Sequence, residues 1–226
     1  MGKIYTAMGL MSGTSLDGVD VSIIKSDGYR EFSSILDRYY EYDRDLIQKI
    51  SHIRQKITNP DGLNTYLDEI KDLEREITLF HAEAVKETLE VSKSSVDLIG
   101  FHGQTIFHDP EEKITKQLGD GRLLSQLTKK KVVYNFRQND LNNGGQGAPL
   151  TPIFHNVIAN KINQKFDVEF PINVLNIGGI ANITKTSDWK YLWSTNKLYA
   201  YDIGPGNCLI DEWIRNNSKN KYDKDG

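Results

Sequence analysis

A glycine-rich stretch near the start of the chain, residues 9–20 (GLMSGTSLDGVD), constrains the possible folds most strongly. Apolar residues precede it and an alternating run, Val19 to Ile24, follows it, which predicts a strand, a tight turn and a second strand. Successive backbone N–H groups in such a turn can surround an anion, and hydroxyl side chains add donors. Asp17 and Asp20 could hold a hydrated divalent metal. The turn is therefore either an ordinary hairpin or a cradle for phosphate.

Composition bounds the class of protein. The chain has 226 residues, 38% hydrophobic and 26% charged, which suffices for one large domain or two small ones. A net charge of −3 gives no basic footprint for nucleic acid and no polybasic membrane patch. The one cysteine, Cys208, excludes an internal disulfide and a cysteine-based zinc site, and no apolar run is long enough to span a bilayer. We expect an α/β protein of the cytoplasm without nucleic-acid or membrane partners.

Apolar spacing predicts the elements that follow the hairpin. A third extended segment over residues 32–40 indicates an antiparallel meander of three strands. Helical spacing predicts helices over 43–57 and 63–91, with a turn at 59–62 between them. A short buried strand is expected over 96–101, and Asp120 is placed to cap a helix over 122–131.

Polar side chains follow two of the predicted strands. The strand at 96–101 ends at His102 and Gln104, which could contact a polar substrate or form a plain turn. A metal held by His102 and His108 is disfavoured, because no third ligand stands at a diagnostic spacing.

The strand at 132–136 delivers Arg137 and Asp140, and a loop with three glycines in four residues follows at 144–147, before a helix over 151–162. At a strand end, Asp140 could act as a general base, with Arg137 as its electrostatic partner or as a clamp on an anion. The alternative is an Arg–Asp salt bridge that only holds the loop.

The opening pattern returns after a polar linker at 163–171. A strand at 174–177, a glycine turn at 178–182, a strand from 183, a strand at 198–201 and a helix around Leu209 and Trp213 repeat the first architecture. Two glycine hairpins, one in each half, could clasp the phosphates of one nucleotide from both sides of a cleft.

Five motifs stand in the order found in the anhydro-N-acetylmuramic acid kinases, and the chain resembles that family over essentially its whole length. These motifs are Met11–Asp20, His102–Thr105, Gly144–Leu150, Asn176–Asn182 and Asp202–Asn207. The resemblance implies an α/β chain with the ribonuclease H-like fold of the actin/hexokinase/Hsp70 superfamily. It implies a mixed sheet with glycine hairpins, one complete domain (residues 1–168) and the start of a second (169–226).

The resemblance further implies an enzyme of cell-wall recycling. Such an enzyme uses ATP, Mg²⁺ and water to open the anhydro bridge of the sugar 1,6-anhydro-N-acetylmuramic acid and to phosphorylate O6. Asp140 would activate the water, assisted by Arg137, and Mg²⁺ would be bound mainly through ATP, near Asp17 and Asp20. The implied phosphate-binding residues are Gly13, Thr14, Ser15, Leu16, Asp17, Gly18, Val19, Asp20, Gly178, Gly179 and Asn182. The implied sugar-side residues are His102, Gln104, Gly145, Gln146, Asp202, Gly204, Gly206 and Asn207.

The chain departs from the family pattern at Asn135, Asn142 and Ile203, where Asp, Ala and Thr are frequent. It also ends before the segment expected to hold adenosine, which would leave apolar sheet surface uncovered. Three hypotheses follow. The first is an active sugar kinase. The second is a non-catalytic remnant or split-gene half that needs a homodimer partner or a complementing C-terminal polypeptide, and the third is another phosphotransferase of the superfamily, such as an acetate or hexose kinase. The motifs around Gly144 and Asp202 argue against the third.

Overall fold

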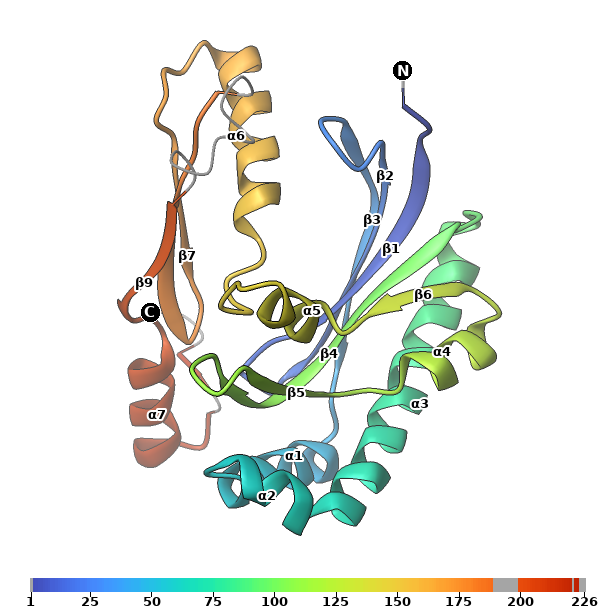
Figure 1. Ribbon diagram of the computed structural model, residues 1–226, viewed down its shortest axis with the longest axis vertical. Coiled ribbons are helices and arrows are strands. Elements are labelled where there is room, and N and C mark those ends of the chain that lie inside the picture. The colour runs from blue at the N-terminus through green and yellow to red at the C-terminus, as the bar shows by residue number, and fades with distance from the viewer. Residues whose placement is uncertain (1, 189–198, 221, 224–226) are drawn as a thin grey trace. The chain divides into compact units, whose positions relative to one another are not determined.

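The computed structural model describes residues 2–188, 199–220 and 222–223. The chain forms two compact units, Met1–Ala148 and Pro149–Gly226, which are described separately (Figure 1). The mixed α/β class expected from the sequence is confirmed. The division into domains after residue 168 stays a prediction. Among the described residues, no helix combines the length and the apolar character that crossing a bilayer requires.

A six-stranded mixed sheet forms the centre of the first unit. Its strands are β1 (Tyr5–Ser12), β2 (Gly18–Ser26), β3 (Phe32–Glu41), β4 (Leu98–Asp109), β5 (Ile114–Leu118) and β6 (Lys131–Tyr134). Strands β1, β2 and β3 form the predicted antiparallel meander, and β4 pairs with β1 in parallel. On its other side, β4 pairs in parallel with β6 over its first residues and antiparallel with β5 over its last ones. The register sets Ser12, at the end of β1, beside Gln104 in the middle of β4.

Helices lie on both faces of this sheet. On one side are α1 (Arg44–Lys56), α2 (Pro60–Thr65), α3 (Leu67–Ser92) and α4 (Gly121–Thr128). The short helix α5 (Phe136–Asn142) lies on the other side, since a Cβ at Gly100 of β4 would meet the Phe136 ring, whereas the adjacent Phe101 packs on His81 of α3. The long helix α3 packs against β2, β3, β4 and β5. Alternate residues of β1, namely Met8, Leu10 and Ser12, are buried, as the period of two in a strand requires. Helix α1 begins at the predicted place because the Asp43 carboxylate accepts the N–H of Leu46 at 2.8 Å.

Two predicted boundaries around α3 are wrong. The turn expected at 59–62 opens α2 instead, because Asn59 caps the N–H of Gly62 at 3.1 Å and Pro60 occupies the first helical position. Helix α3 consequently begins at Leu67 rather than at residue 63.

The polar segments after the predicted strands also differ from expectation. Strand β4 does not end at Phe101 but continues through His102 and Gln104, so neither residue lies in a turn. Arg137 and Asp140 lie on the short helix α5 rather than in a loop at a strand end. Strand β5, which the sequence did not indicate, completes this edge of the sheet.

The second unit contains a three-stranded antiparallel sheet, in the order β7–β8–β9. Its elements are α6 (Pro152–Phe166), β7 (Asn173–Ile177), β8 (Ile180–Lys185), β9 (Tyr199–Pro205) and α7 (Cys208–Asn217). The predicted repeat of strand, turn, strand, strand and helix is confirmed. The glycine turn is shorter than predicted, so Asn182 lies on β8, whereas Asp202 and Gly204 lie on β9. Helix α6 takes up part of the predicted linker, and Leu198, expected to begin the third strand, lies outside the described residues.

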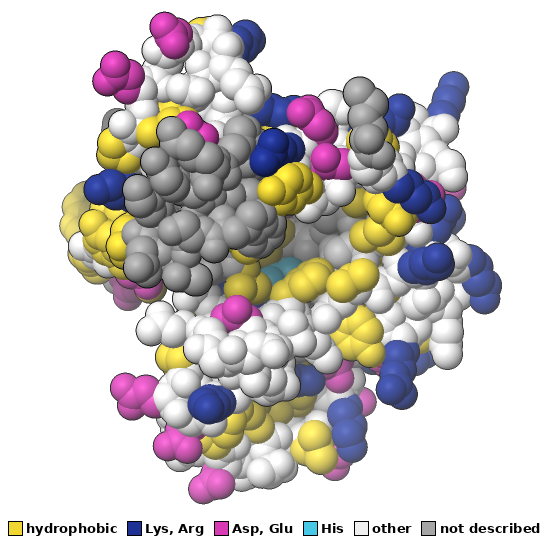
Figure 2. All heavy atoms as spheres, turned by 45° about the horizontal axis from the view of Figure 1, so that its top comes forward, with side chains coloured by type: hydrophobic (Ala, Val, Ile, Leu, Met, Phe, Trp, Pro, Cys, Tyr) yellow, Lys and Arg dark blue, Asp and Glu magenta, His cyan; other side chains and the backbone are white. Residues whose placement is uncertain are grey.

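One face of the second sheet carries exposed apolar side chains. Figure 2 draws all hydrophobic side chains in yellow, and several groups of them reach the surface in that view. Cross-strand pairing places Leu175, Ile183 and Tyr201 on the same face, and Leu175 and Tyr201 are 51% and 58% exposed. On the opposite face, the hydroxyl of Thr184 is buried and lies 2.8 Å from Nδ1 of His155 on α6. The expected exposure of apolar sheet surface is thus confirmed for these residues.

Candidate functional site

The hairpin loop between β1 and β2 is held through its carbonyl oxygens. Gln104 Nε2 donates a hydrogen bond to the carbonyl of Gly13 at 2.9 Å, and Arg54 donates to the carbonyl of Thr14 at 3.2 Å. In contrast, the backbone N–H groups of Thr14 and Ser15, two exposed residues, have no hydrogen-bond partner in the part of the chain that the structure describes. Two adjacent donors are therefore free at the loop, an arrangement that suits an anion.

Three other residues expected to bind phosphate contribute to the packing of the fold instead. Leu16 and Val19 are buried, so their side chains belong to the core, and Leu16 adopts a left-handed backbone with φ of 60°. Gly18 is required by space, because a Cβ there would overlap the carbonyl oxygen of Tyr40 on β3. Only the backbone of these residues could meet a ligand.

Two carboxylates follow the free N–H groups. Ser15 Oγ donates to Asp17 Oδ1 at 2.6 Å. The pKa of Asp20 is raised by partial burial and, to a lesser extent, by the negative charge of Asp17. A divalent cation would relieve this repulsion, and carboxylate oxygens are ligands that Mg²⁺ accepts. The described residues contain no group of three or more His, Cys, Asp or Glu side chains that could hold a metal, so Mg²⁺ would need further oxygens from phosphate or water.

Arg137 on α5 links strand β4 to the glycine-rich loop. Its Nε donates to His102 Nε2 at 2.9 Å, and its Nη1 donates to the carbonyl of Gly147 at 3.0 Å. Because the carbonyl of Gly103, 2.6 Å from His102 Nδ1, can only accept, Nδ1 carries the ring proton. Burial and then the charge of Arg137 lower the pKa of His102 to about 4, so the ring is neutral at pH 7.

Asp140 lies close to this network but forms no ion pair with Arg137, so the salt-bridge alternative is wrong. Its Oδ2 accepts the N–H of Gly147 at 2.8 Å, and its main-chain carbonyl accepts the N–H of Gly145 at 2.9 Å. A Cβ at Gly145 would lie 2.6 Å from Oδ1 and closer still to Oδ2, so only glycine fits without movement. Oδ1 has no hydrogen-bond partner among the described residues and can accept a proton or a water molecule.

His108 joins the network although the sequence assigned it no task. Its Nδ1 lies 3.1 Å from Thr115 Oγ1, and burial followed by the charge of Arg137 lowers its pKa. A Cβ at Gly147 would come within 3.0 Å of the His108 ring, so this histidine limits the space around the loop. Gln146, expected on the sugar side, is exposed.

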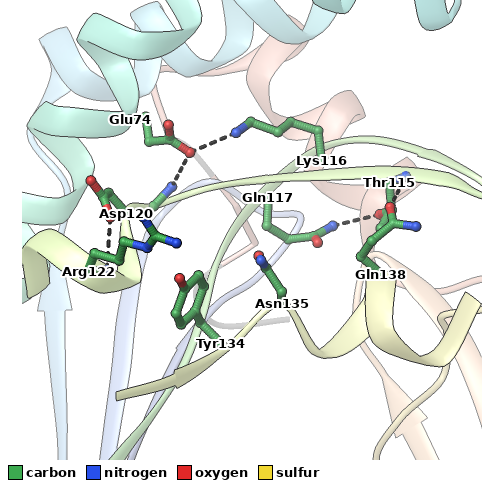
Figure 3. Close-up of a pocket in the computed structure, with 10 residues that line it drawn as sticks. Glu74, Thr115, Lys116, Gln117, Asp120, Arg122, Tyr134, Asn135 and Gln138 are labelled. Atoms are coloured by element: carbon green, nitrogen blue, oxygen red, sulfur yellow. Dashed lines mark hydrogen bonds and ion pairs between the residues drawn. The ribbon is translucent and has the colours of Figure 1, made fainter. Parts of the chain in front are cut away.

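A polar pocket of about 390 Å³ lies beside the start of α5 (Figure 3). Lys116 pairs with Glu74 in its wall at 2.7 Å, and Asn135 and Gln138 also line it. Consecutive helical residues point about 100° apart, so Gln138 serves this pocket while its neighbour Arg137 serves the loop network. Two residues that the sequence analysis named also line this pocket: Asn135, where the chain departs from the family pattern, and Asp120, expected to cap a helix.

The expected residues of the second unit gather around its glycine hairpin. The N–H groups of Gly206 and Asn207 donate to the carbonyls of Gly179 and Gly178 at 2.9 and 2.8 Å. A Cβ at Gly206 would overlap the carbonyl oxygen of Gly178, so the two loops pack backbone against backbone.

Polar side chains cross the same sheet beside this hairpin. Asn182 on β8 pairs with Asn176 on β7 and with Asp202 on β9, so the three lie on one face. Gly204, with φ of +153°, follows the irregularity in the β8–β9 register. The expected site residues therefore form two groups, one in each unit.

Comparison with known proteins gives a consistent result. A sequence model described as anhydro-N-acetylmuramic acid kinase matches residues 5–226. An anhydro-N-acetylmuramic acid kinase of Pelagibacter ubique is 54% identical over 226 residues, which cover 100% of this chain and 58% of that protein. One from Agrobacterium fabrum is 41% identical over 236 residues, covering 100% of this chain and 59% of the relative. The chain thus spans less than two thirds of the length of these relatives.

Proposed function

Because the chain belongs to the anhydro-N-acetylmuramic acid kinase family, we propose that it carries out, or forms part of, an ATP-dependent sugar kinase reaction. The enzyme would open the anhydro bridge of 1,6-anhydro-N-acetylmuramic acid with water and phosphorylate O6, giving N-acetylmuramic acid 6-phosphate. We place this reaction in cell-wall recycling in the cytoplasm. The match of the family over residues 5–226 is the observation that carries the proposal, and it brings the actin/hexokinase/Hsp70 fold with it.

The hairpin loop of the first unit would bind the phosphates of ATP. The free N–H groups of Thr14 and Ser15 supply donors that need no rearrangement. Gly178 and Gly179 with Asn182 would form a second phosphate hairpin. Asp17 and Asp20 would lie near a Mg²⁺ ion held mainly by ATP, and such an ion neutralises charge that develops on the transferred phosphoryl group.

Asp140 would act as the general base. Its free Oδ1 takes a proton from the water that attacks the anomeric carbon, and the bond from that carbon to O6 breaks. The released O6 then attacks the γ-phosphorus of ATP, and ADP leaves. Arg137, fixed by neutral His102 and by the carbonyl of Gly147, keeps a positive charge beside the developing anion. His102, Gly145, Gln146, Asp202, Gly204, Gly206 and Asn207 would shape the sugar side. Gln104, also expected there, is buried and binds the carbonyl of Gly13 instead.

Phosphate transfer from ATP to 1,6-anhydro-N-acetylmuramic acid tests this function directly. Asp140→Asn keeps the shape of the side chain and an acceptor for Gly147, but it removes the base, so we expect a rate lower by about 100-fold or more. Asp72→Asn, at an exposed position of α3, is the matched control and should leave the rate unchanged. Turnover by Asp140→Asn at the parent rate would contradict the role of Asp140.

A second candidate is one part of a divided kinase, and the exposed apolar face of the second sheet is the observation that motivates it. The adenosine site would then come from a complementing polypeptide, and a homodimer partner is the other way to cover the face. Calorimetry should give weak ATP binding for this chain alone. Binding should be restored when a polypeptide matching the uncovered part of the Pelagibacter relative is added. Submicromolar ATP affinity of the chain alone would contradict this second candidate.

A further inference from the structure

A buried polar cluster lies directly next to the hairpin loop and takes no part in the proposed chemistry. Ser12, the last residue of β1, lies 2.8 Å from the hydroxyl of Tyr42 and 3.2 Å from Nε2 of His81. The three residues are 1%, 2% and 0% exposed. Side chains from β1, from the β3–α1 connection and from α3 therefore meet in the core one residue before Gly13.

The proton positions in this cluster follow from its last acceptor. His81 Nδ1 lies 2.8 Å from the carbonyl of Ile77, which can only accept, so Nδ1 carries a proton. Burial lowers the pKa of His81 to about 4, so the ring is neutral and its Nε2 is an acceptor. Ser12 must then donate to His81, and Tyr42 must donate to Ser12. The cluster is a directed chain of hydrogen bonds with one arrangement at neutral pH.

This chain of bonds fixes both ends of the loop. Tyr42 holds Ser12 before the loop through its hydroxyl, and its backbone N–H donates to the carbonyl of Asp17 at the other end at 2.9 Å. Gln104, which is 0% exposed, gives its Nε2 to the carbonyl of Gly13 while its buried Oε1 has no partner. An unpaired buried acceptor is unfavourable for stability. Gln104 therefore holds the carbonyl of Gly13 in place even though its own buried Oε1 is left without a hydrogen bond.

We propose that Tyr42, Ser12, His81 and Gln104 are positioning residues, which hold the N–H groups of Thr14 and Ser15 ready for a phosphate chain. The proposal rests on the phosphate-binding role given to this loop above. Loop carbonyls bound to the protein interior cannot turn toward an incoming anion, so the loop need not reorganise when phosphate binds.

Binding of inorganic tripolyphosphate to the full chain, measured by calorimetry, tests the proposal without an adenosine or sugar site. Tyr42→Phe removes only the hydroxyl and should weaken binding by about tenfold, the equivalent of one buried hydrogen bond. Tyr40→Phe is the matched control, because its hydroxyl also makes a 2.8 Å bond, to Thr88, away from the loop. It should change binding by less than about twofold while losing similar unfolding stability.

A second variant separates positioning from general stability. Gln104→Met removes the unpaired Oε1 together with the bond to Gly13, so we expect near-parental stability but weaker tripolyphosphate binding. Amide shifts of Thr14 and Ser15 on titration should locate the bound anion. Equal binding by the parent, Tyr42→Phe and Gln104→Met would overturn the positioning role alone. No binding by the parent would overturn the phosphate role of the loop and the positioning role with it.

Discussion

Replacement of Gly145 by alanine would test how the glycine-rich loop is held against α5. The backbone of Gly145 is outside the left-handed region, so alanine is conformationally allowed there. Space is the obstacle, because the new Cβ would lie 2.6 Å from Asp140 Oδ1 and closer to Oδ2. The carboxylate must turn away, and its 2.8 Å bond to the N–H of Gly147 is then lost.

The size of the effect follows from that lost bond. A hydrogen bond to a charged group contributes about 1.5–3 kcal/mol. The loop is largely exposed and can relax, so we expect Gly145→Ala to lower the free energy of unfolding by about 2 kcal/mol and the melting temperature by about 4–8 °C. Urea unfolding followed by circular dichroism measures the first quantity. Exchange of the Gly147 amide, followed by NMR, should accelerate by about 30-fold.

The Asp140→Ala background supplies the control, because it removes the group that the new Cβ would meet. Asp140→Ala alone should cost about as much as Gly145→Ala, since both remove the same bond. Adding Gly145→Ala to it should cost less than about 0.5 kcal/mol. An equal cost of Gly145→Ala in both backgrounds would refute the steric reasoning.

Two further predictions concern pH and the second hairpin. Lowering the pH from 7 to 5 should reduce the free energy of unfolding measured in urea, because His81 and His102 have folded pKa values of about 4 and the unfolded chain binds their protons near pH 6.5. The free energy of unfolding should change with pH by at most about 1.4 kcal/mol per pH unit for each histidine, and His102→Gln should reduce this slope. A free energy of unfolding that rises toward pH 5 would contradict the lowered pKa values of the two histidines. Gly206→Ala should lower the free energy of unfolding by about 1–3 kcal/mol, because its Cβ would collide with the carbonyl of Gly178. The amide NMR shifts that the substitution changes should include those of residues 178–179, and changes confined to distant residues would contradict the collision.

The sequence predicted elements whose signals are local. The meander β1–β2–β3 follows from alternation, and α1 follows from apolar spacing. The Asp43 cap of α1 is a further local signal, which the structure added. Helix α5 was missed because it has only seven residues, too few to show a helical period, and because Asn135 starts it from a left-handed backbone without a side-chain cap. The continuation of β4 was missed because His102 is polar and follows an apolar run, a pattern that is typical of the end of a strand. In the folded chain, the carbonyl of Gly103 and the guanidinium of Arg137 satisfy its ring.

Contacts between distant residues account for what sequence spacing could not give. Ser12 meets Tyr42 and His81 across 30 and 69 positions, and Gln104 meets Gly13 across 91. No periodicity or motif links such residues, because the sheet register and the packing of α3 bring them together. The motif His102–Thr105 did place Gln104 at the candidate site, although its amide lies against the hairpin in the core rather than in a loop.

The number of glycines in the opening stretch suggested close approach of the backbone to an anion, but the structure gives most of them no such task. A Cβ at Gly9 would have open space, and one at Gly13 would meet mainly Ser15 Oγ at 3.3 Å. Only Gly18 is sterically required, and its neighbour is the Tyr40 carbonyl of the adjacent strand rather than a ligand site. Glycine content alone therefore fits an ordinary hairpin equally well. The case for a phosphate cradle depends instead on donors from β4, α1 and the β3–α1 connection, which bind the loop carbonyls and leave two N–H groups free.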